Sequence, residues 1–413
     1  MAMRKVRGTK DIFFDKCRLR KEIIERCWSV SESYGFEPVE VPVLEYEDTY
    51  KRTLGEWSDI VSKEMYSFED KGGEVLTLRP EFTAGIMRAV CSEDMRMPLR
   101  LFSHGPLFRY ERPQMGRQRQ LYQMNWEHIG TSSSYADAEL ICMIDNILKI
   151  LNLDHAIKLK INSLGCSESR FRYKNAISQY FERFKDDLSE YSKVRLEKNP
   201  LRILDSKDEK DIEIGRSAPS ISSYYTISSK QFLEELLSSL TKLGVKYELD
   251  ETLVRGLDYY NHSVFEFVSD EIGAQAAVCG GGRYDGLSEN MGFSYRCSVG
   301  AALGLDRICL MIKNLYFKKT PIIFIIPTDS ATGYALILAD KLRRELNSHY
   351  RIVVDVEGTV KRRMKNADNC EAQYVIVLGD QELASNVVRV RDFVTGVEKE
   401  VTFDKLCEFF VES

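Results

Sequence analysis

The sequence predicts a multidomain protein that combines α/β and α+β architecture. Three observations support this fold class. Residues 99–129 carry two strand patterns joined by turn residues, which predicts an antiparallel hairpin. Residues after Pro321 alternate short apolar strands with helices, which predicts a small and largely parallel sheet. The chain has 413 residues and is therefore too long for one ordinary core.

The first elements are a helix and a strand interrupted by prolines. Apolar residues recur at helical spacing over 15–33, with Asp15 as the expected N-cap and Gly35 as the expected end of the helix. Residues 36–44 form an extended stretch that contains two prolines. Because proline cannot donate to a strand ladder, this stretch belongs at a sheet edge or an interface.

The predicted hairpin runs through residues 99–110 and 121–129, and its connection is rich in arginine. The second strand alternates between two faces. One face carries Tyr122, Met124, Trp126 and His128, and the other carries Gln123, Asn125 and Glu127.

The remaining elements follow from the same periodicities. Residues 167–249 have the charged texture of a mostly helical insertion. Helices are expected at 136–151 and 301–312, and strands at 157–161, 252–268 and 275–279. The C-terminal part is expected to contain strands at 322–326, 350–356 and 374–378, helices at 331–346 and 359–367, and a final strand and helix.

Composition is that of a globular protein, with 44% hydrophobic and 29% charged residues. No apolar run approaches the roughly 20 residues that span a bilayer. The net charge of −5 argues against indiscriminate binding of nucleic acid but allows local basic patches. The ten cysteines include no CxxC pair, so we expect reduced thiols, a cytoplasmic location and no structural metal site.

The common phosphate-binding loops are missing from the sequence. It contains no GxxxxGK[ST], and the glycine run at 280–286 does not fit GxGxxG. A bound nucleotide would therefore need side-chain cations and a metal ion. The candidate cations are Arg109, Arg255, Arg283 and Arg307.

Several segments together resemble the histidyl-tRNA synthetases, a family of class II aminoacyl-tRNA synthetases. Residues 36–44, 99–130 and 298–307 are similar to the three class II signature segments. Residues 253–260 (LVRGLDYY) and 281–287 (GGRYDGL) are similar to two segments specific for the histidine enzymes. The matches continue at 78–83 and 195–205, so they cover almost the whole chain in family order.

The resemblance implies a histidine–tRNA ligase. Such an enzyme activates histidine with ATP and Mg²⁺ to histidyl-adenylate and transfers histidine to the 3′ end of tRNA(His). The implied architecture is a catalytic core with an antiparallel sheet flanked by helices, a helical insertion and an α/β anticodon-binding domain. The corresponding residues are 1–166 and 250–312 for the core, 167–249 for the insertion, 313–320 for a linker and 321–413 for the anticodon-binding domain. A homodimer built on the strand around Pro42 is also implied.

The resemblance further implies roles for individual residues. Arg109 and Arg255 are the implied catalytic residues, with Arg109 on the α-phosphate of ATP and Arg255 at the reacting centre. The implied ATP-binding residues are Arg109, Glu111, Arg117 and Arg307. The implied histidine-binding residues are Glu81, Thr83 and Gln123 for the ammonium group, Glu127 and Tyr260 for the ring, and Phe82, Arg255, Tyr259 and Tyr284 around them.

Contacts to tRNA are implied in two places. Gln114, Arg117 and Arg119 of the hairpin connection would meet the extra 5′ guanosine of tRNA(His), and the basic residues 361–365 would contact backbone phosphates near the anticodon. Departures from the family pattern are mild. Phe82 stands where glycine is common, Leu121 and Tyr122 replace Phe-His, and Ser298 replaces a frequent proline.

Two other functions share such a core. One is a regulatory subunit of ATP phosphoribosyltransferase, which generally lacks the C-terminal domain and has a damaged 253–260 segment. The other is a non-catalytic RNA-binding sensor, which predicts lost phosphate-binding arginines or added kinase-like sequence. The sequence has neither set of features.

Overall fold

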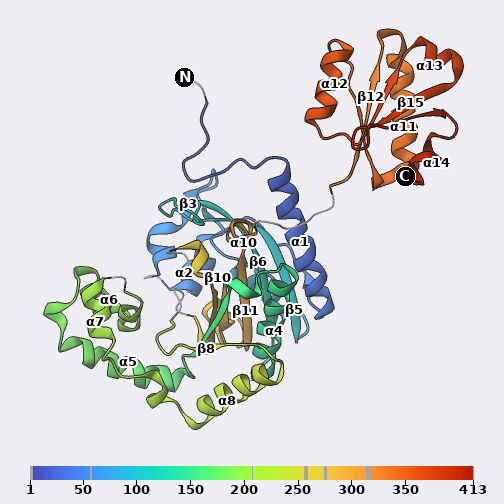
Figure 1. Ribbon diagram of the computed structural model, residues 1–413. Helices are drawn as coiled ribbons and strands as arrows, with labels where there is room; N and C mark the ends of the chain where they lie inside the picture. The colour runs from blue at the N-terminus through green and yellow to red at the C-terminus, as the bar shows by residue number, and fades with distance from the viewer. Residues whose placement is uncertain are drawn as a thin grey trace. The chain divides into compact units, whose positions relative to one another are not determined.

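The computed structural model describes residues 3–55, 58–206, 208–254, 259–273, 277–312 and 319–412 (Figure 1). The chain divides into two compact units, Met1–Leu315 and Tyr316–Ser413. Each unit has its own hydrophobic core and is described by itself.

The first unit is organised around a mixed sheet whose interior strands are antiparallel. Short strands at the two edges pair in parallel with their neighbours. Among the described residues, the strand order is β1 (Glu37–Pro38), β5 (Leu99–Phe108), β6 (Gln120–Ile129), β11 (Ser298–Gly304), β10 (Ala277–Arg283), β9 (Asn261–Val268), β7 (Lys158–Ser163) and β8 (Glu248–Leu249).

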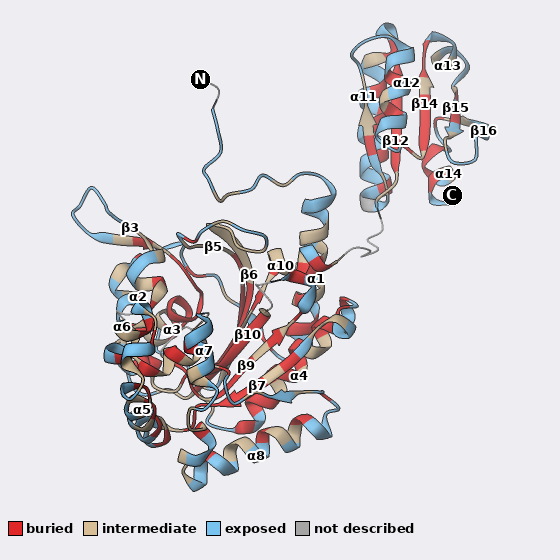
Figure 2. Cartoon of the chain, turned by 60° about the vertical axis from the view of Figure 1, so that its left-hand side comes forward, coloured by how far each residue is buried: buried red, intermediate tan, exposed pale blue. Residues whose placement is uncertain are grey.

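Long helices cover one face of this sheet. They are α1 (Asp15–Ser33), α4 (Ser134–Ile150) and α8 (Ile227–Lys242). The short helix α10 (Leu305–Met311) packs in the same layer. Their apolar faces form one buried cluster with Met124 and Trp126 of β6, as the alternation of that strand predicts. Figure 2 shows these buried strands and helix faces in red.

The opposite face of the sheet meets a second cluster and carries a cavity. The elements on this side include α2 (Glu47–Leu54), α3 (Thr83–Ser92), α9 (Leu287–Asn290), the π-helix Ile60–Glu64, and a small sheet of β2 (Leu44–Tyr46), β4 (Val75–Leu78) and β3 (Tyr66–Glu69). The insertion adds α5 (Ser167–Glu182), α6 (Glu190–Lys198), α7 (Glu209–Gly215) and 3₁₀ turns at Lys185–Asp187, Pro200–Asp205 and Ile221–Tyr224. Its mostly helical character is as predicted.

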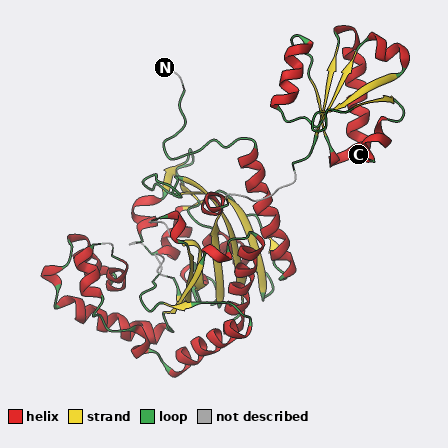
Figure 3. Cartoon of the chain, in the orientation of Figure 1, coloured by secondary structure: helices red, strands yellow, loops and turns green. Residues whose placement is uncertain are grey.

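The second unit is a sheet between helices, and its elements are distinguished by type in Figure 3. Strands β13 (Arg351–Val354), β12 (Ile322–Pro327) and β14 (Tyr374–Leu378) are parallel, whereas β15 (Val387–Asp392) and β16 (Glu398–Thr402) are antiparallel. Helices α11 (Thr332–Leu346) and α14 (Leu406–Val411) pack on one face, and α12 (Val360–Asn369) packs on the other. The short α13 (Asp380–Ser385) joins β14 to β15.

The ends of α1 show what local sequence predicted and what it did not. The helix spans Asp15–Ser33 as expected, but its N-cap is Phe14, and Asp15 is instead the first helical residue and pairs with Arg18. Gly35 closes the helix as expected, with φ of +74°. The N–H groups of Gly35 and Phe36 donate to the carbonyls of Glu32 and Ser31, the pattern of a glycine-terminated helix.

Several predicted elements differ from the structure in their bounds, and two of the differences concern the large sheet near the cavity. Residues 301–304 were expected to be helical but complete strand β11, and the helix begins only at Leu305. A strand was expected from residue 252, but β9 begins at Asn261; residues 255–258 lie outside the described residues. The small residues of β11 carry no clear period, and pairing with β6 and β10 decides their conformation.

Among the described helices, none has both the length and the apolar composition that crossing a membrane requires.

Candidate functional site

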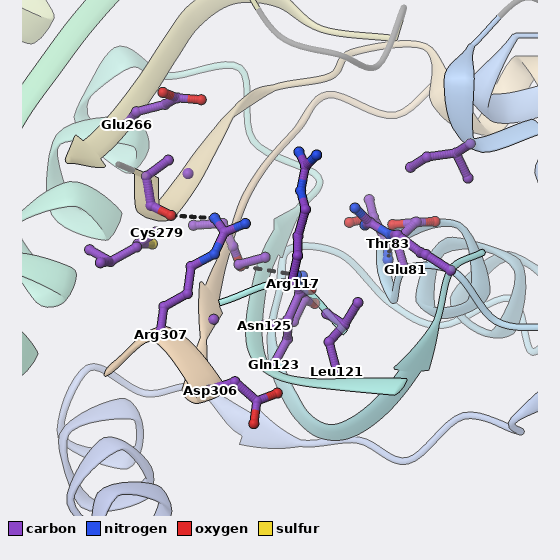
Figure 4. Close-up of a pocket in the computed structure, with 18 of the residues that line it drawn as sticks. Glu81, Thr83, Arg117, Leu121, Gln123, Asn125, Glu266, Cys279, Asp306 and Arg307 are labelled. Atoms are coloured by element: carbon purple, nitrogen blue, oxygen red, sulfur yellow. Dashed lines mark hydrogen bonds between the residues drawn. The ribbon is translucent and has the colours of Figure 1, made fainter. Parts of the chain in front are cut away.

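A cavity of about 510 Å³ lies on the face of the large sheet that α3 borders (Figure 4). Its volume falls in the range of small-molecule sites. Its walls come from strands β6, β9, β10 and β11, the start of α3, the π-helix and the hairpin connection. The site residues implied by the family resemblance that line it are Glu81, Thr83, Arg109, Glu111, Arg117, Gln123, Tyr259, Tyr260, Tyr284 and Arg307.

Strand β6 provides the floor of the cavity. Gln123 and Asn125 line it, and Glu127 lies on the same face of the strand. The alternation seen in the sequence therefore separates a polar face toward the cavity from an apolar face toward the core.

Glu81 is held at the first turn of α3. Its carboxylate accepts hydrogen bonds from the backbone N–H groups of Thr83 (2.6 Å) and Ala84 (2.8 Å). Burial raises the pKa of Glu81, and these hydrogen bonds oppose that rise. The result is a fixed acceptor at the cavity wall.

Glu127 has no exposed surface and lies behind the lining residues. The Thr83 hydroxyl donates to its Oε1 at 2.5 Å, and the Tyr284 hydroxyl donates to its Oε2. Burial raises the pKa of Glu127 to about 8, although the two hydroxyl donors lower it. Gly300 makes room for this carboxylate, because a Cβ there would lie 1.8 Å from Oε2.

Aromatic side chains form another wall. The ring of Tyr259 lies 4.6 Å from that of Tyr260 and 5.6 Å from that of Tyr284, measured between centroids. Phe82 does not line the cavity: it is buried in the core, with the Arg79 guanidinium 4.4 Å from its ring centre. Phe82 therefore lies behind the cavity wall, and its implied role in binding histidine stays a prediction.

Among the residues that the structure describes, three arginines line the cavity. The Nε of Arg109 donates to the Pro80 carbonyl at 2.8 Å, and Arg117 forms an ion pair with Glu111 at 2.8 Å. The Nε of Arg307 donates to the Gly116 carbonyl at 3.3 Å. Figure 4 shows Arg307 and Glu81 on opposite sides of the cavity, with Arg117 between them in this view.

The charge of Arg307 is destabilised in this position. Burial, followed by the like charge of Arg117, lowers the pKa of the Arg307 guanidinium. Clustered cations that repel one another favour an anionic ligand, and arginine can bind two phosphate oxygens at once. This end of the cavity is therefore suited to phosphate groups.

Arg283 is not part of this group, which corrects the sequence hypothesis. Its side chain has no exposed surface and forms ion pairs with Asp137 and Asp285. It also donates to the carbonyls of Thr131 and Ser133 at 2.7 and 3.0 Å. Arg283 thus joins β10 to α4 and the segment before it, and no phosphate can reach it.

The remaining predicted residues are Arg255, Gln114 and Arg119. Arg255 is outside the described residues. Gln114 and Arg119 belong to the hairpin connection and do not line the cavity. The backbone N–H of Arg117 donates to the Gln114 carbonyl at 3.0 Å, and the Arg119 guanidinium stacks 3.8 Å above the ring centre of Tyr110.

The cavity also contains polar residues that no sequence hypothesis assigned. Asn125 could have been found, because it lies between Gln123 and Glu127 in the alternating strand. Asp59 and Glu64 carry no such signal, since their position depends on the π-helix. The unassigned polar lining residues are Asp59, Glu64, Gln118, Asn125, Glu266, Cys279 and Asp306.

Comparisons with known proteins agree over the whole chain. Residues 8–308 match the family model of histidyl-tRNA synthetase, and residues 322–413 match that of an anticodon-binding domain. A histidine–tRNA ligase of Wolbachia pipientis subsp. Culex pipiens is 46% identical over 99% of this chain and 100% of its own length. One from Rickettsia bellii is 43% identical over 99% of this chain and 98% of its own length.

Solved structures of similar proteins agree with these sequence comparisons. The apo histidyl-tRNA synthetase of S. aureus has a TM-score of 0.83 at 31% identity, covering 99% of this chain and all of that one. A Bacillus halodurans protein described as an ATP phosphoribosyltransferase regulatory subunit/histidyl-tRNA synthetase has a TM-score of 0.67 at 24% identity, covering 92% and 99%. The second likeness concerns the fold alone. With the family model and full-length relatives in agreement, this chain belongs to the histidyl-tRNA synthetases, a family of class II aminoacyl-tRNA synthetases.

Proposed function

We propose that the chain, as a histidine–tRNA ligase, uses this cavity to join histidine to ATP before it transfers histidine to the 3′ end of tRNA(His). The observation that supports the location is the division of one cavity into two chemically different ends. Glu81, an acceptor for the amino acid, lies on one side of the cavity and the cation Arg307 on the other (Figure 4), while Arg109 donates to the carbonyl of Pro80.

The histidine end would bind its ligand through buried polar groups. Glu81 and Gln123 accept hydrogen bonds from the α-ammonium group. Glu127, which Thr83 and Tyr284 cover in this structure, would accept from a ring N–H after their hydroxyls turn away from it. Because an analogue lacking a ring N–H leaves a buried carboxyl unpaired, such a pocket discriminates strongly.

The phosphate end would stabilise the charge that develops during adenylate formation. A carboxylate oxygen of histidine bonds to the α-phosphorus of ATP while the bond from that phosphorus to the β-phosphate oxygen breaks, and pyrophosphate leaves with the electron pair. Arg109 binds the α-phosphate, and Arg117 and Arg307 bind the remaining phosphates. Fixed cations stabilise the transition state without the reorganisation that water requires.

The donors of the cavity also fit Mg²⁺. This ion is held by one or two carboxylates together with substrate phosphates. Glu111 and Glu266 line the cavity, and the charges of both act on Arg307, so they are the residues that would hold the ion beside the phosphates. When bound, Mg²⁺ would neutralise phosphate charge.

The roles of the remaining residues rest on family resemblance. Arg255 would supply positive charge at the reacting centre, and Arg255→Ala should lower the rate of activation far more than it weakens histidine binding. Gln114, Arg117 and Arg119 would meet the acceptor end of tRNA. A cytoplasmic homodimer, with core, insertion and anticodon-binding domain divided at the predicted residues, completes the proposal.

The test is histidine-dependent exchange of pyrophosphate into ATP without tRNA. We expect exchange with histidine and none with the other amino acids. Two variants make the test specific to the two ends. Glu81→Gln should raise the KM for histidine about tenfold or more and leave the KM for ATP unchanged. Arg307→Gln should raise the KM for ATP by a similar factor and leave the KM for histidine unchanged. A folded protein without exchange would overturn the proposal and favour the regulatory-subunit function.

A further inference from the structure

Asn125 is a buried polar residue in the cavity floor that the proposed function leaves unused. Its side chain lines the cavity, although the residue is only 3% exposed. The Nδ2 group donates to the Ala301 carbonyl at 3.2 Å, as Figure 4 shows by a dashed line. The Oδ1 atom has no hydrogen-bond partner among the described residues.

The neighbour on β11 fixes which way the amide points. A backbone carbonyl can only accept hydrogen bonds, so the Ala301 oxygen requires the nitrogen of Asn125 on its side. The amide oxygen consequently points away from β11, in a side chain that lines the cavity. Buried acceptors are nearly always paired in folded proteins, and an unpaired one destabilises the fold. An acceptor kept in this position indicates a ligand that donates to it.

The position of Asn125 in β6 narrows the kind of donor. It lies two residues from Gln123 and two from Glu127, so the three side chains follow one face of the strand at intervals of roughly 7 Å. A ligand that extends from Glu81 and Gln123 to Glu127 must therefore pass over Asn125. Anionic groups are unsuitable here, because an amide oxygen and the nearby carboxyls all accept hydrogen bonds.

We propose that Oδ1 of Asn125 accepts a hydrogen bond from the α-ammonium group of the amino-acid substrate. This inference rests on the proposed function and adds a substrate-binding residue to it. An ammonium group has three N–H donors, and Glu81, Gln123 and Asn125 provide three acceptors for them. The ring N–H has its own acceptor in Glu127.

The experiment compares Asn125→Ala with the wild-type protein using three ligands. Histidine and histidinol carry the amine, whereas imidazolepropionate lacks it. The variant should bind histidine and histidinol roughly ten- to a hundredfold more weakly, as expected for loss of a hydrogen bond to a charged group. Binding of imidazolepropionate should change less than threefold, and so should the KM for ATP. An equal loss for all three ligands would overturn the assignment to the ammonium group.

Further variants separate ligand binding from a structural role. Asn125→Leu keeps the size of the side chain without an acceptor, whereas Asn125→Asp in its protonated form retains both a donor for Ala301 and an acceptor for the ligand. We expect Asp to recover part of the histidine affinity and Leu to recover none. Asn146→Ala removes a half-buried asparagine on α4 that bonds to Tyr34, outside the cavity. This control should leave the KM for histidine unchanged.

The failure of this inference can be distinguished from that of the proposed function. If the wild-type protein shows no histidine-dependent exchange, the proposed function is wrong. If the wild-type protein is active and the Asn125→Ala variant binds histidine as tightly as the wild-type protein, only the role of Asn125 is wrong.

Discussion

Glu127 combines complete burial with two hydroxyl donors, and its protonation state depends on that environment. Its folded-state pKa of about 8 is above the ordinary value of 4.5, since burial disfavours the charged form. The folded state therefore binds the proton more tightly than the unfolded state. The resulting stabilisation is fully present below about pH 4.5 and is lost as the pH rises through about 8.

Glu127→Gln removes this titration and leaves a neutral side chain of similar shape. We expect the free energy of unfolding of the wild-type protein, relative to the variant, to fall by roughly a few kcal/mol between pH 5 and pH 8.5. Chemical denaturation at both pH values measures the difference, and Glu81 contributes equally to both proteins. A difference that does not change with pH would contradict the raised pKa.

Gly300 is constrained by the same carboxyl group. A methyl group in Gly300→Ala would overlap Oε2 of Glu127 and must displace it. We expect a loss of histidine affinity of about tenfold or more, together with a lower thermal unfolding temperature. Pyrophosphate exchange and thermal unfolding measure the two effects. Gly333→Ala is the matched control, because a Cβ at that helical position meets nothing within 4 Å and should leave both quantities unchanged or slightly raise stability.

At the scale of elements, a buried ion pair fastens helix α4 to strand β10. Asp137 and Arg283 both have fully buried side chains, and Ser263 of β9 also donates to Asp137. Burial raises the pKa of Asp137, while the charge of Arg283 and its hydrogen bonds oppose that rise. The pair helps to position the sheet that carries the cavity floor.

Removing Asp137 leaves the buried guanidinium of Arg283 with Asp285 as its remaining ionic partner among the described residues. We expect Asp137→Leu to reduce the free energy of unfolding by about 3–5 kcal/mol. Replacing both residues, as in Asp137→Leu with Arg283→Met, should recover part of that loss because the fully buried guanidinium is removed as well, and only the less buried Asp285 then loses its partner. Urea denaturation of the two variants tests this, and a double variant less stable than the single one would argue against a coupled pair.

At the scale of the whole molecule, adenylate formation and contacts near the anticodon are expected to depend on different units. Helix α12 presents Lys361, Arg362 and Lys365 to solvent. Arg363 differs from its neighbours: it is buried and donates to the carbonyls of Pro327 and Asp355. The basic cluster seen in the sequence thus contains three exposed cations and one structural arginine.

Replacing the three exposed cations with alanine should weaken tRNA binding and leave histidine-dependent pyrophosphate exchange unchanged. Each lost phosphate contact reduces the magnitude of the slope of log K against log salt concentration by about 0.9, so a change of up to about 2.7 is expected. Binding of tRNA measured at several salt concentrations gives this slope. An unchanged slope would place the phosphate contacts elsewhere on the molecule.

The sequence by itself determined features that depend on neighbouring residues or on recognisable segments. The periodicity of residues 15–33 predicted α1, the alternation of 121–129 predicted the two faces of β6, and the motifs at 253–260 and 281–287 indicated the family. Helix and strand periods are local properties, so they can be seen without a fold. The bounds of β11 could not be seen in this way, because pairing with distant strands holds it extended.

Only the tertiary structure decided which polar residues line the site and which support it. The sequence alone makes Arg109, Arg283 and Arg307 equally good candidates for binding phosphate. In the structure, Arg283 forms an ion pair with Asp137 of α4, whereas the other two line the cavity. The raised pKa of Glu127 and the unpaired oxygen of Asn125 also depend on burial by β11 and α3. A charged or polar group acquires its role from the partners and the solvent around it, and residues far away in the chain provide both.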